Sequence, residues 1–171
     1  IINSLLDISR IESGKMELGK ENFDMISLIR QVMAMFEKQI MEKGLALSAD
    51  LPKNPAIIKA DLDAMTQVLT NLTNNALKFT PRGTVTIALK DYSDSIEFSI
   101  SDTGIGISAG DMPKLFNKFH QFSRVNGPGE KGTGLGLAIA RGIINAHGGS
   151  IWAESELGKG TKVSFRLPKK I

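Results

Sequence analysis

Two short segments in which apolar and polar residues alternate constrain the fold more than any other feature of the sequence. In residues 84–90 and 95–101, an apolar side chain occurs at every second position, which is typical of strands with one buried face. The polar residues 91–94 between them predict a turn, so the two strands should pair as a hairpin. The hairpin predicts a sheet with one apolar face, which other elements must cover.

Amphipathic helices are predicted on both sides of this hairpin. The strongest spans about residues 61–79 and is ended by the sequence 80–83, which contains proline and glycine. A second helix begins after Asp24, a residue type that caps helix N-termini, and ends at Gly44. A third is predicted by the apolar residues that recur from Leu135 to Ala146.

Four further segments are predicted as strands: residues 45–51, 56–60, 150–154 and 161–167. Together with the hairpin and the helices, they predict an α+β fold. We expect a two-layer sandwich in which three helices lie on one face of a mixed, mostly antiparallel, five-stranded sheet.

The first residues of the chain predict another, shorter helix. Ile1, Leu5, Ile8 and Ile11 recur at helical spacing, and Gly19 is expected to end the helix. The stripe is too short to be stable alone and must pack against something else. Because the chain begins without methionine or a signal-peptide pattern, we expect it to be a piece of a longer protein.

Composition narrows the classes of function. The chain has 171 residues, a length that suits one ordinary domain or one domain with a stub. Without cysteine there is no disulfide framework or thiolate zinc site, and two histidines make a multi-histidine metal cluster improbable. A net charge of +3 does not favour a nucleic-acid partner. No apolar run approaches the roughly 18 residues of a membrane helix, so we expect no membrane contact by this segment.

A polar stripe on the helix over 61–79 is the first candidate binding feature. Asn71, Asn75 and Lys78 share one narrow face, beside the apolar face of the same helix. Amide oxygens suit a hard cation and an ammonium suits phosphate, so the stripe predicts contact with magnesium and a polyphosphate. The alternative is an ordinary solvated helix face.

Asp102 is the second candidate. It continues the parity of the buried positions of its strand, so its carboxylate should point inward, where it needs hydrogen-bond donors. Gly104 and Gly106 follow, and glycines there allow a flat ligand to approach the backbone closely. The exocyclic amine of a purine is a suitable donor. The alternative is an aspartate that only stabilises a turn.

A glycine-rich loop before the last helix is the third candidate. Gly132, Gly134 and Gly136 alternate with Thr133 and Leu135, which leaves backbone N–H groups available to phosphate at a helix N-terminus. No strand is predicted before this loop and no Gly-Lys-Ser/Thr sequence is present, so neither a dinucleotide fingerprint nor a Walker loop fits.

These three features, in this order, closely resemble the ATP-binding catalytic domain of sensor histidine kinases. Its superfamily also contains DNA gyrase, the heat-shock chaperone and the mismatch-repair ATPases, which share the Bergerat fold. The matching segments are an asparagine box (71–80), a first glycine box (102–107), a phenylalanine box (114–119) and a second glycine box (132–137). Lys131 stands where the family often has another glycine.

The resemblance implies a role for each site residue. Asn75 would ligate Mg²⁺ with Asn71 nearby, Lys78 would meet the phosphates of ATP, and Phe79 would lie near the sugar or base. Asp102 would bind the adenine amine, with Gly104, Gly106 and Ile107 forming the base pocket. Residues 108–131 would form a lid anchored by Phe116 and Phe119. Two lid cations would either reach the γ-phosphate or remain solvated charges, and the phosphate loop completes the predicted ATP site: Arg124, Lys131, Gly132, Thr133, Gly134, Leu135 and Gly136.

The resemblance also implies a division of the chain and a set of partners. Residues 6–16 resemble the last helix of the family's dimerisation domain, so residues 1–18 would be the end of that helix and a linker, and 19–171 the catalytic domain. The implied partners are the dimerisation and phosphoacceptor domain of the same protein, a response-regulator receiver domain, and a second copy in the full-length homodimer. The implied location is cytoplasmic, with or without a membrane anchor elsewhere.

Two other functions remain as alternatives, a conformational ATPase and a nucleotide sensor without transferase activity. The superfamily's ATPases have a glutamate general base four residues before the magnesium-binding asparagine, whereas this chain has Asn71, which cannot accept a proton. Neither His120 nor His147 matches the family's phosphoacceptor sequence. We therefore expect a protein-histidine kinase whose acceptor histidine is missing from this chain, so that the chain binds ATP without phosphorylating itself.

Overall fold

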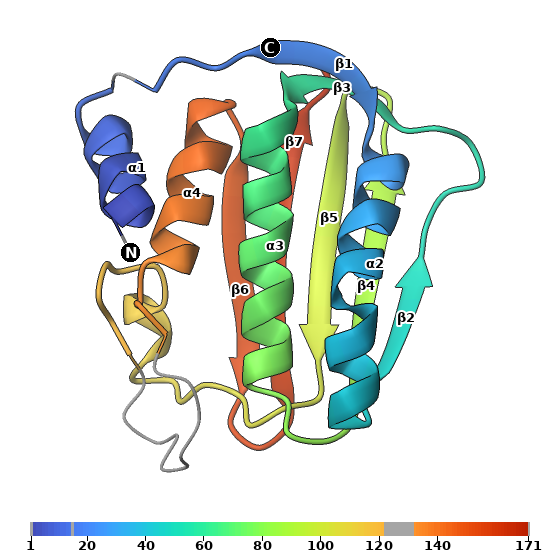
Figure 1. The fold of residues 1–171 in the computed structure, drawn as a ribbon, viewed down its shortest axis with the longest axis vertical. Helices are drawn as coiled ribbons and strands as arrows, with labels where there is room; N and C mark the ends of the chain where they lie inside the picture. Colours follow the sequence, from blue (N-terminus) through green and yellow to red (C-terminus); the bar gives the residue numbers. More distant parts are fainter. Residues whose placement is uncertain (1, 15, 122–131, 171) are drawn as a thin grey trace.

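The computed structural model describes residues 2–14, 16–121 and 132–170, and it is a sandwich of helices on one face of a sheet (Figure 1). The helices are α1 (Ile2–Glu12), α2 (Met25–Lys43), α3 (Leu62–Lys78), the short 3-10 helix η1 (Met112–Lys114) and α4 (Gly136–Ala146). The strands are β1 (Lys20–Asp24), β2 (Ala46–Asp50), β3 (Ile57–Asp61), β4 (Thr84–Asp91), β5 (Ser95–Asp102), β6 (Ser150–Glu156) and β7 (Gly160–Pro168). Among these helices, none is long and apolar enough to cross a membrane.

The main sheet has five strands in the order β2-β4-β5-β7-β6. All neighbouring pairs are antiparallel except β2 and β4, which run parallel. The hairpin is confirmed, with Leu89 of β4 opposite Phe98 of β5. Helices α2, α3 and α4 cover one face, as Figure 1 shows, so the expected mixed sheet with three helices on one face is confirmed.

The strand predicted over 56–60 lies outside the main sheet. It is β3, and it pairs with β1 in a separate two-stranded sheet that the sequence analysis did not predict. The sequence of β1, Lys-Glu-Asn-Phe-Asp, has one large apolar residue and therefore no alternation to detect. Ile58 and Ala60 of β3 are buried, so this small sheet closes one end of the core.

Helix ends are fixed by capping interactions. The Asp24 carboxylate accepts hydrogen bonds from the N–H groups of Ile26 and Ser27 at the start of α2, and a third from Ala56 just before β3. Gly44 ends α2 in the left-handed conformation (φ 64°). At the start of α3, Asp61 accepts from the N–H of Ala64. Both predicted boundaries of α2 are confirmed.

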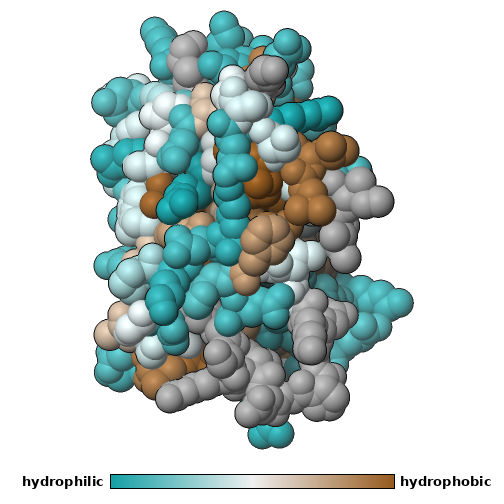
Figure 2. Space-filling view, turned by 90° about the vertical axis from the view of Figure 1, so that its left-hand side faces the viewer, coloured by the Kyte–Doolittle hydropathy of each residue, from teal (hydrophilic) through white to brown (hydrophobic). Residues whose placement is uncertain are grey.

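Helix α1 ends at Glu12, seven residues before the predicted end at Gly19. Its last apolar contact is made by Ile11, which packs so closely on Gly142 of α4 that a Cβ there would lie 2.5 Å from the Ile11 side chain. Two residues after the end of the helix, Gly14 adopts the left-handed conformation (φ 63°), which diverts the chain from the helical path. Leu5 and Leu6 stay exposed, and the surface on this side shows apolar patches among hydrophilic residues (Figure 2).

His147 connects the end of α4 with the start of α3. Its ring is fully buried; Nε2 accepts the Asp61 N–H at 3.0 Å, and Nδ1 lies 2.8 Å from the Ile143 carbonyl oxygen. These partners require a neutral ring with its proton on Nδ1. Burial lowers the pKa of the imidazole, an effect that the Ile143 hydrogen bond and the Asp61 charge oppose and the Lys20 charge reinforces.

We predict that the free energy of unfolding falls as the pH drops below about 6.5. Because the pKa of His147 is lowered in the folded state, the unfolded chain binds the proton more tightly, and acid favours unfolding. Denaturant titrations between pH 7.5 and 5.5 should show a slope of at most about 1.4 kcal/mol per pH unit from this group. His147→Gln should remove that slope and the control His120→Gln should keep it; the reverse pattern would contradict the assignment.

Candidate functional site

A pocket of about 560 Å³, counted with its open mouth, lies between α3 and the ends of β5 and β7. Most of its walls are apolar, and Asn75, Asp102 and Thr161 are the polar side chains among its lining residues. The apolar walls come from α3, the glycine loop after β5, η1 and α4: Leu72, Ala76, Phe79, Ile105, Ile107, Leu115 and Leu137, with Ile100 and Val163 from the sheet. Such a pocket suits a flat apolar ligand with a few polar groups.

Asp102 ends β5 with its side chain in this pocket, as the strand parity predicts. Its Oδ1 accepts the Gly104 N–H at 2.9 Å, which holds the carboxylate at the turn into the glycine loop. Burial raises the pKa of this carboxyl group, while hydrogen bonds from the backbone of Gly104 and Thr161 act in the opposite direction. A half-buried acceptor is thus fixed in orientation and available to a donor in the pocket.

The first glycine loop is pressed against the protein's own backbone. A Cβ on Gly104 would lie 2.1 Å from the Phe79 carbonyl oxygen, and one on Gly106 (φ 68°) would lie 2.0 Å from that of Glu156. The sequence predicts that these glycines allow a flat ligand to approach the backbone. In the structure they let the loop pack between the end of α3 and the end of β6, which shapes the pocket that holds Ile107.

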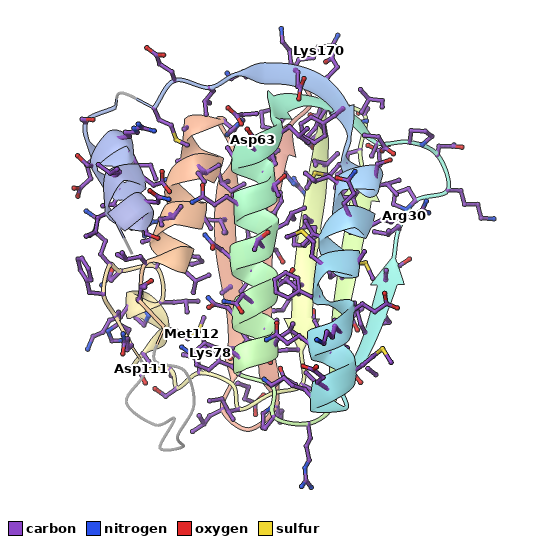
Figure 3. The ribbon with its side chains drawn as sticks, in the orientation of Figure 1. Arg30, Asp63, Lys78, Asp111, Met112 and Lys170 are labelled. Carbon is purple, nitrogen blue, oxygen red and sulfur yellow. The ribbon has the colours of Figure 1, made fainter. Side chains whose placement is uncertain are left out.

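The polar stripe of α3 lies at this pocket, but its members have different partners. Asn75 lines the pocket, whereas the Asn71 amide donates to the Gly136 carbonyl oxygen at 3.2 Å and ties α3 to the start of α4. The Lys78 ammonium lies 5.2 Å from the centre of the Phe79 ring. In Figure 3, Lys78 lies at the lower end of α3, opposite to Asp63 at the upper end.

The second glycine loop faces Lys78. A Cβ on Gly132 would lie 2.6 Å from the Lys78 Nζ, so this ammonium and the loop are in direct contact. Gly134 is left-handed (φ 69°) and its carbonyl oxygen accepts the Phe119 N–H at 2.9 Å. Thr133 caps the Leu135 N–H, and Leu135 is buried at the start of α4. The structure thus brings Asn75, Lys78 and Gly132–Gly136 to one side of α3.

Part of the predicted lid lies outside the described residues. Arg124 and Lys131 fall in 122–131, so their predicted roles remain predictions. Of the two predicted anchors, Phe116 packs against the core and lies 5.8 Å from the Arg141 guanidinium. Phe119 instead is 62% exposed with a φ of 58°, because its backbone turns to bond Gly134, and its side chain is not an anchor here.

The residues that β6 and β7 contribute at the pocket were not predicted from the sequence. Thr161 and Val163 of β7 line it, and Ser155 of β6 donates to the Gly160 carbonyl oxygen and accepts the Ile107 N–H. The sequence carries no direct signal for these contacts, because Asp102, Thr161 and Ser155 become neighbours only through the register of β5, β7 and β6. In the described part of the chain, no group of three or more acidic or histidine side chains could hold a metal ion by itself.

Residues 60–171 match the family described as histidine kinase-, DNA gyrase B-, and HSP90-like ATPase. Over 169 residues the chain is 39% identical to histidine protein kinase DivJ of Caulobacter vibrioides, covering 98% of this chain and 28% of that protein. It is 35% identical over 173 residues to sensor histidine kinase WalK of Bacillus subtilis, covering 99% and 28%. The chain therefore spans well under half the length of these curated relatives.

Solved structures give the same fold. Full-length ShkA in complex with AMPPNP superposes with a TM-score of 0.87 and 30% identity, covering 98% of this chain and 35% of that one. The catalytic domain of histidine kinase ThkA superposes with a TM-score of 0.79 and 32% identity, covering 91% of this chain and 100% of that one. ThkA in complex with the response regulator TrrA superposes with a TM-score of 0.78 and 27% identity, covering 98% and 48%.

We predict that Gly104→Ala destabilises the fold by about 1–3 kcal/mol, because the new methyl group must displace the Phe79 carbonyl. Amide exchange at Ile105, whose N–H bonds that carbonyl oxygen, should accelerate with it. The matched control is Gly110→Ala, where a Cβ meets no atom within 4 Å, and which should stay within about 0.5 kcal/mol of the unaltered chain. Equal stability of the two variants in urea titrations would contradict this account of the loop.

Proposed function

The chain belongs to the family of histidine kinase-, DNA gyrase B- and HSP90-like ATPases, and from that we propose that it is the ATP-binding catalytic domain of a sensor histidine kinase. In this proposal it supplies the γ-phosphoryl group of Mg-ATP to a histidine on a dimerisation domain. The observation that carries the proposal is the Asp102 carboxylate, fixed inside an apolar pocket beside the Asn75 and Lys78 face of α3.

The pocket selects the base by its shape and by one acceptor. A purine fits between the apolar side chains of α3 and those of the glycine loop, for example Ala76 and Ile107. Its exocyclic amine donates to Asp102, so the carboxylate of this half-buried residue is paired. Phe79 lies at the end of α3 next to Lys78, where the sugar leaves the pocket.

The phosphates extend from the pocket toward Lys78 and the second glycine loop. Lys78 supplies a positive charge, and the N–H groups of Gly132–Gly136 and the start of α4 add donors. The Asn75 amide oxygen is a suitable Mg²⁺ ligand. Since the described residues hold no carboxylate cluster, the protein would bind the metal together with the nucleotide, whose phosphate charge the ion neutralises. Arg124 and Lys131 are proposed as additional cations for the γ-phosphate.

A kinase agrees with the site better than a hydrolysing ATPase does. Asn71 stands where a general base would activate water, and an amide cannot accept the proton. In the structure this amide bonds the Gly136 carbonyl oxygen, so it acts as a link between α3 and α4. Slow hydrolysis preserves ATP for transfer to a protein acceptor. A nucleotide sensor without transferase activity would use the same contacts.

The proposed partners follow from α1 and from the relatives. With Leu5 and Leu6 exposed on α1, residues 1–18 are proposed as the end of a dimerisation helix and its linker, and 19–171 as the catalytic domain. ThkA has been solved with a response regulator, which supports a receiver domain as a further partner here. The site of action proposed for this domain is the cytoplasm.

We predict that ADP binds at least about tenfold more tightly than GDP, because guanine places an oxygen against the Asp102 acceptor. Asp102→Asn should weaken ADP binding even without magnesium, whereas Asn75→Ala should mainly remove the magnesium dependence. Calorimetric titrations with and without Mg²⁺ measure both effects. Equal affinity for the two nucleotides, or full magnesium dependence in Asn75→Ala, would contradict the respective assignment.

We predict that the chain alone binds ATP without stoichiometric self-phosphorylation, because transfer needs an acceptor in line with the γ-phosphate. His147 is buried between α3 and α4, away from the pocket lining. Incubation with γ-labelled ATP and Mg²⁺ should label protein only when a dimerisation domain with its acceptor histidine is added. Stoichiometric label on the chain alone, abolished by His120→Ala or His147→Gln, would overturn this division of labour, and rapid steady hydrolysis would favour the ATPase alternative.

A further inference from the structure

Three polar side chains form a row across the end of the sheet. In the strand register Asp102 of β5 is opposite Thr161 of β7, and Thr161 is opposite Ser155 of β6. Along their strands they continue the alternation of Ile100, Val163 and Ala153, which pack in the core or against it. The three polar residues therefore lie on the face that the helices cover. Asp102 and Thr161 line the pocket, and Ser155 lies behind Thr161.

Ser155 is the hydrogen-bond centre of this row. Its Oγ donates to the Gly160 carbonyl oxygen at 2.8 Å, accepts the Ile107 N–H at 2.8 Å and lies 2.8 Å from the Thr161 Oγ1. A hydroxyl group has one proton and two acceptor positions. Since the Ser155 proton goes to Gly160, the proton in the third bond must come from Thr161.

The hydrogen bonds of Ser155 determine that the Thr161 hydroxyl group acts as the donor in the bond between them. Its only proton points to Ser155, so the remaining lone pairs are what Thr161 can offer to the pocket. The backbone of Thr161 also bonds the Asp102 carboxylate. The pocket therefore presents two neighbouring acceptors, the Asp102 carboxylate and the Thr161 hydroxyl oxygen, and no donor from either side chain.

We infer that Ser155 is a positioning residue that sets base specificity: it turns the Thr161 hydroxyl into an acceptor beside Asp102 and anchors Ile107 on the other wall. The inference rests on the proposed binding of an adenine nucleotide. Two adjacent acceptors match an exocyclic amine, directly or through a water that donates to both. A base with a carbonyl oxygen in that place meets only acceptors. Without Ser155, the Thr161 hydroxyl can rotate and donate to such an oxygen.

The test compares ADP with inosine diphosphate, which differs in having a carbonyl oxygen where adenine has its amine. In the unaltered 171-residue chain, we expect ADP to bind at least about tenfold more tightly. Ser155→Ala should weaken ADP binding by about fivefold and reduce the discrimination to about threefold or less. Ser155→Thr, which keeps the hydroxyl group, should retain the discrimination. A role in folding alone would weaken both ligands equally and leave their ratio unchanged.

Two further variants keep the test decisive. Ser99→Ala is the matched control, because Ser99 lies on the opposite face of β5 between the buried Phe98 and Ile100, and it should change neither affinity. Thr161→Val has no hydroxyl group that could donate to the carbonyl oxygen, so it should weaken ADP binding and still discriminate better than Ser155→Ala does. The double variant should discriminate as Thr161→Val does, because the loss in Ser155→Ala requires the Thr161 hydroxyl.

Amide exchange gives an independent reading, since the Ile107 N–H should exchange faster in Ser155→Ala than in Ser99→Ala. An unchanged ratio of the two affinities in a folded Ser155→Ala would overturn the inference and leave the proposed function intact. Failure of the unaltered chain to bind ADP would overturn the proposed function and, with it, this inference.

Discussion

The position of the pocket depends on where the rows of apolar side chains that run across neighbouring strands of the sheet end. Across β5, β7 and β6 the register aligns Phe98 with Phe165 and Ile151, then Ile100 with Val163 and Ala153. The next row is polar, and it is the row of Asp102, Thr161 and Ser155. Polar groups in a half-buried position need partners, and these three supply them for one another and for the two loops that meet there. The pocket begins at the boundary between the last apolar row and this polar one.

Helix α3 contributes to both the core and the site because it is fixed by its buried apolar face and by hydrogen bonds at its two ends, which leaves its polar face available. Its apolar face is buried on the sheet, with Met65 and Leu69 fully covered. Its start is fixed by the Asp61 cap and by His147, and the Lys43 ammonium at the end of α2 donates to the Leu77 carbonyl oxygen near its last turn. Asn75 and Lys78 are therefore placed by the ends of the helix, and their own side chains remain available to the pocket and the glycine loop.

The sequence predicted the features that depend on patterns within one segment, and it missed those that depend on contacts between segments far apart in the chain. Periodicity over ten or more residues predicted α3 and the hairpin, and parity predicted that Asp102 points inward. Strand β1 was missed because one phenylalanine makes no pattern, and the pairing that stabilises it comes from β3, more than thirty residues later. The contact of Gly104 with the Phe79 carbonyl and the bonds of Ser155 were also out of reach, because they depend on how separate loops meet. Residue type alone indicates that a position is special without showing what approaches it.

Although α1 is short, it is an integral part of this structure. It is held by the buried side chain of Ile8 and by the close approach of Ile11 to Gly142. Two polar contacts add to this, Asp7 with Gln67 on α3 and Glu12 with Lys118. Lys118 precedes Phe119, whose N–H bonds the Gly134 carbonyl oxygen of the second glycine loop. An unbroken series of contacts thus connects α1 with the loop that faces Lys78. Because Gly142 has no side chain, Ile11 can approach the backbone of α4, and this contact sets how closely α1 lies on α4.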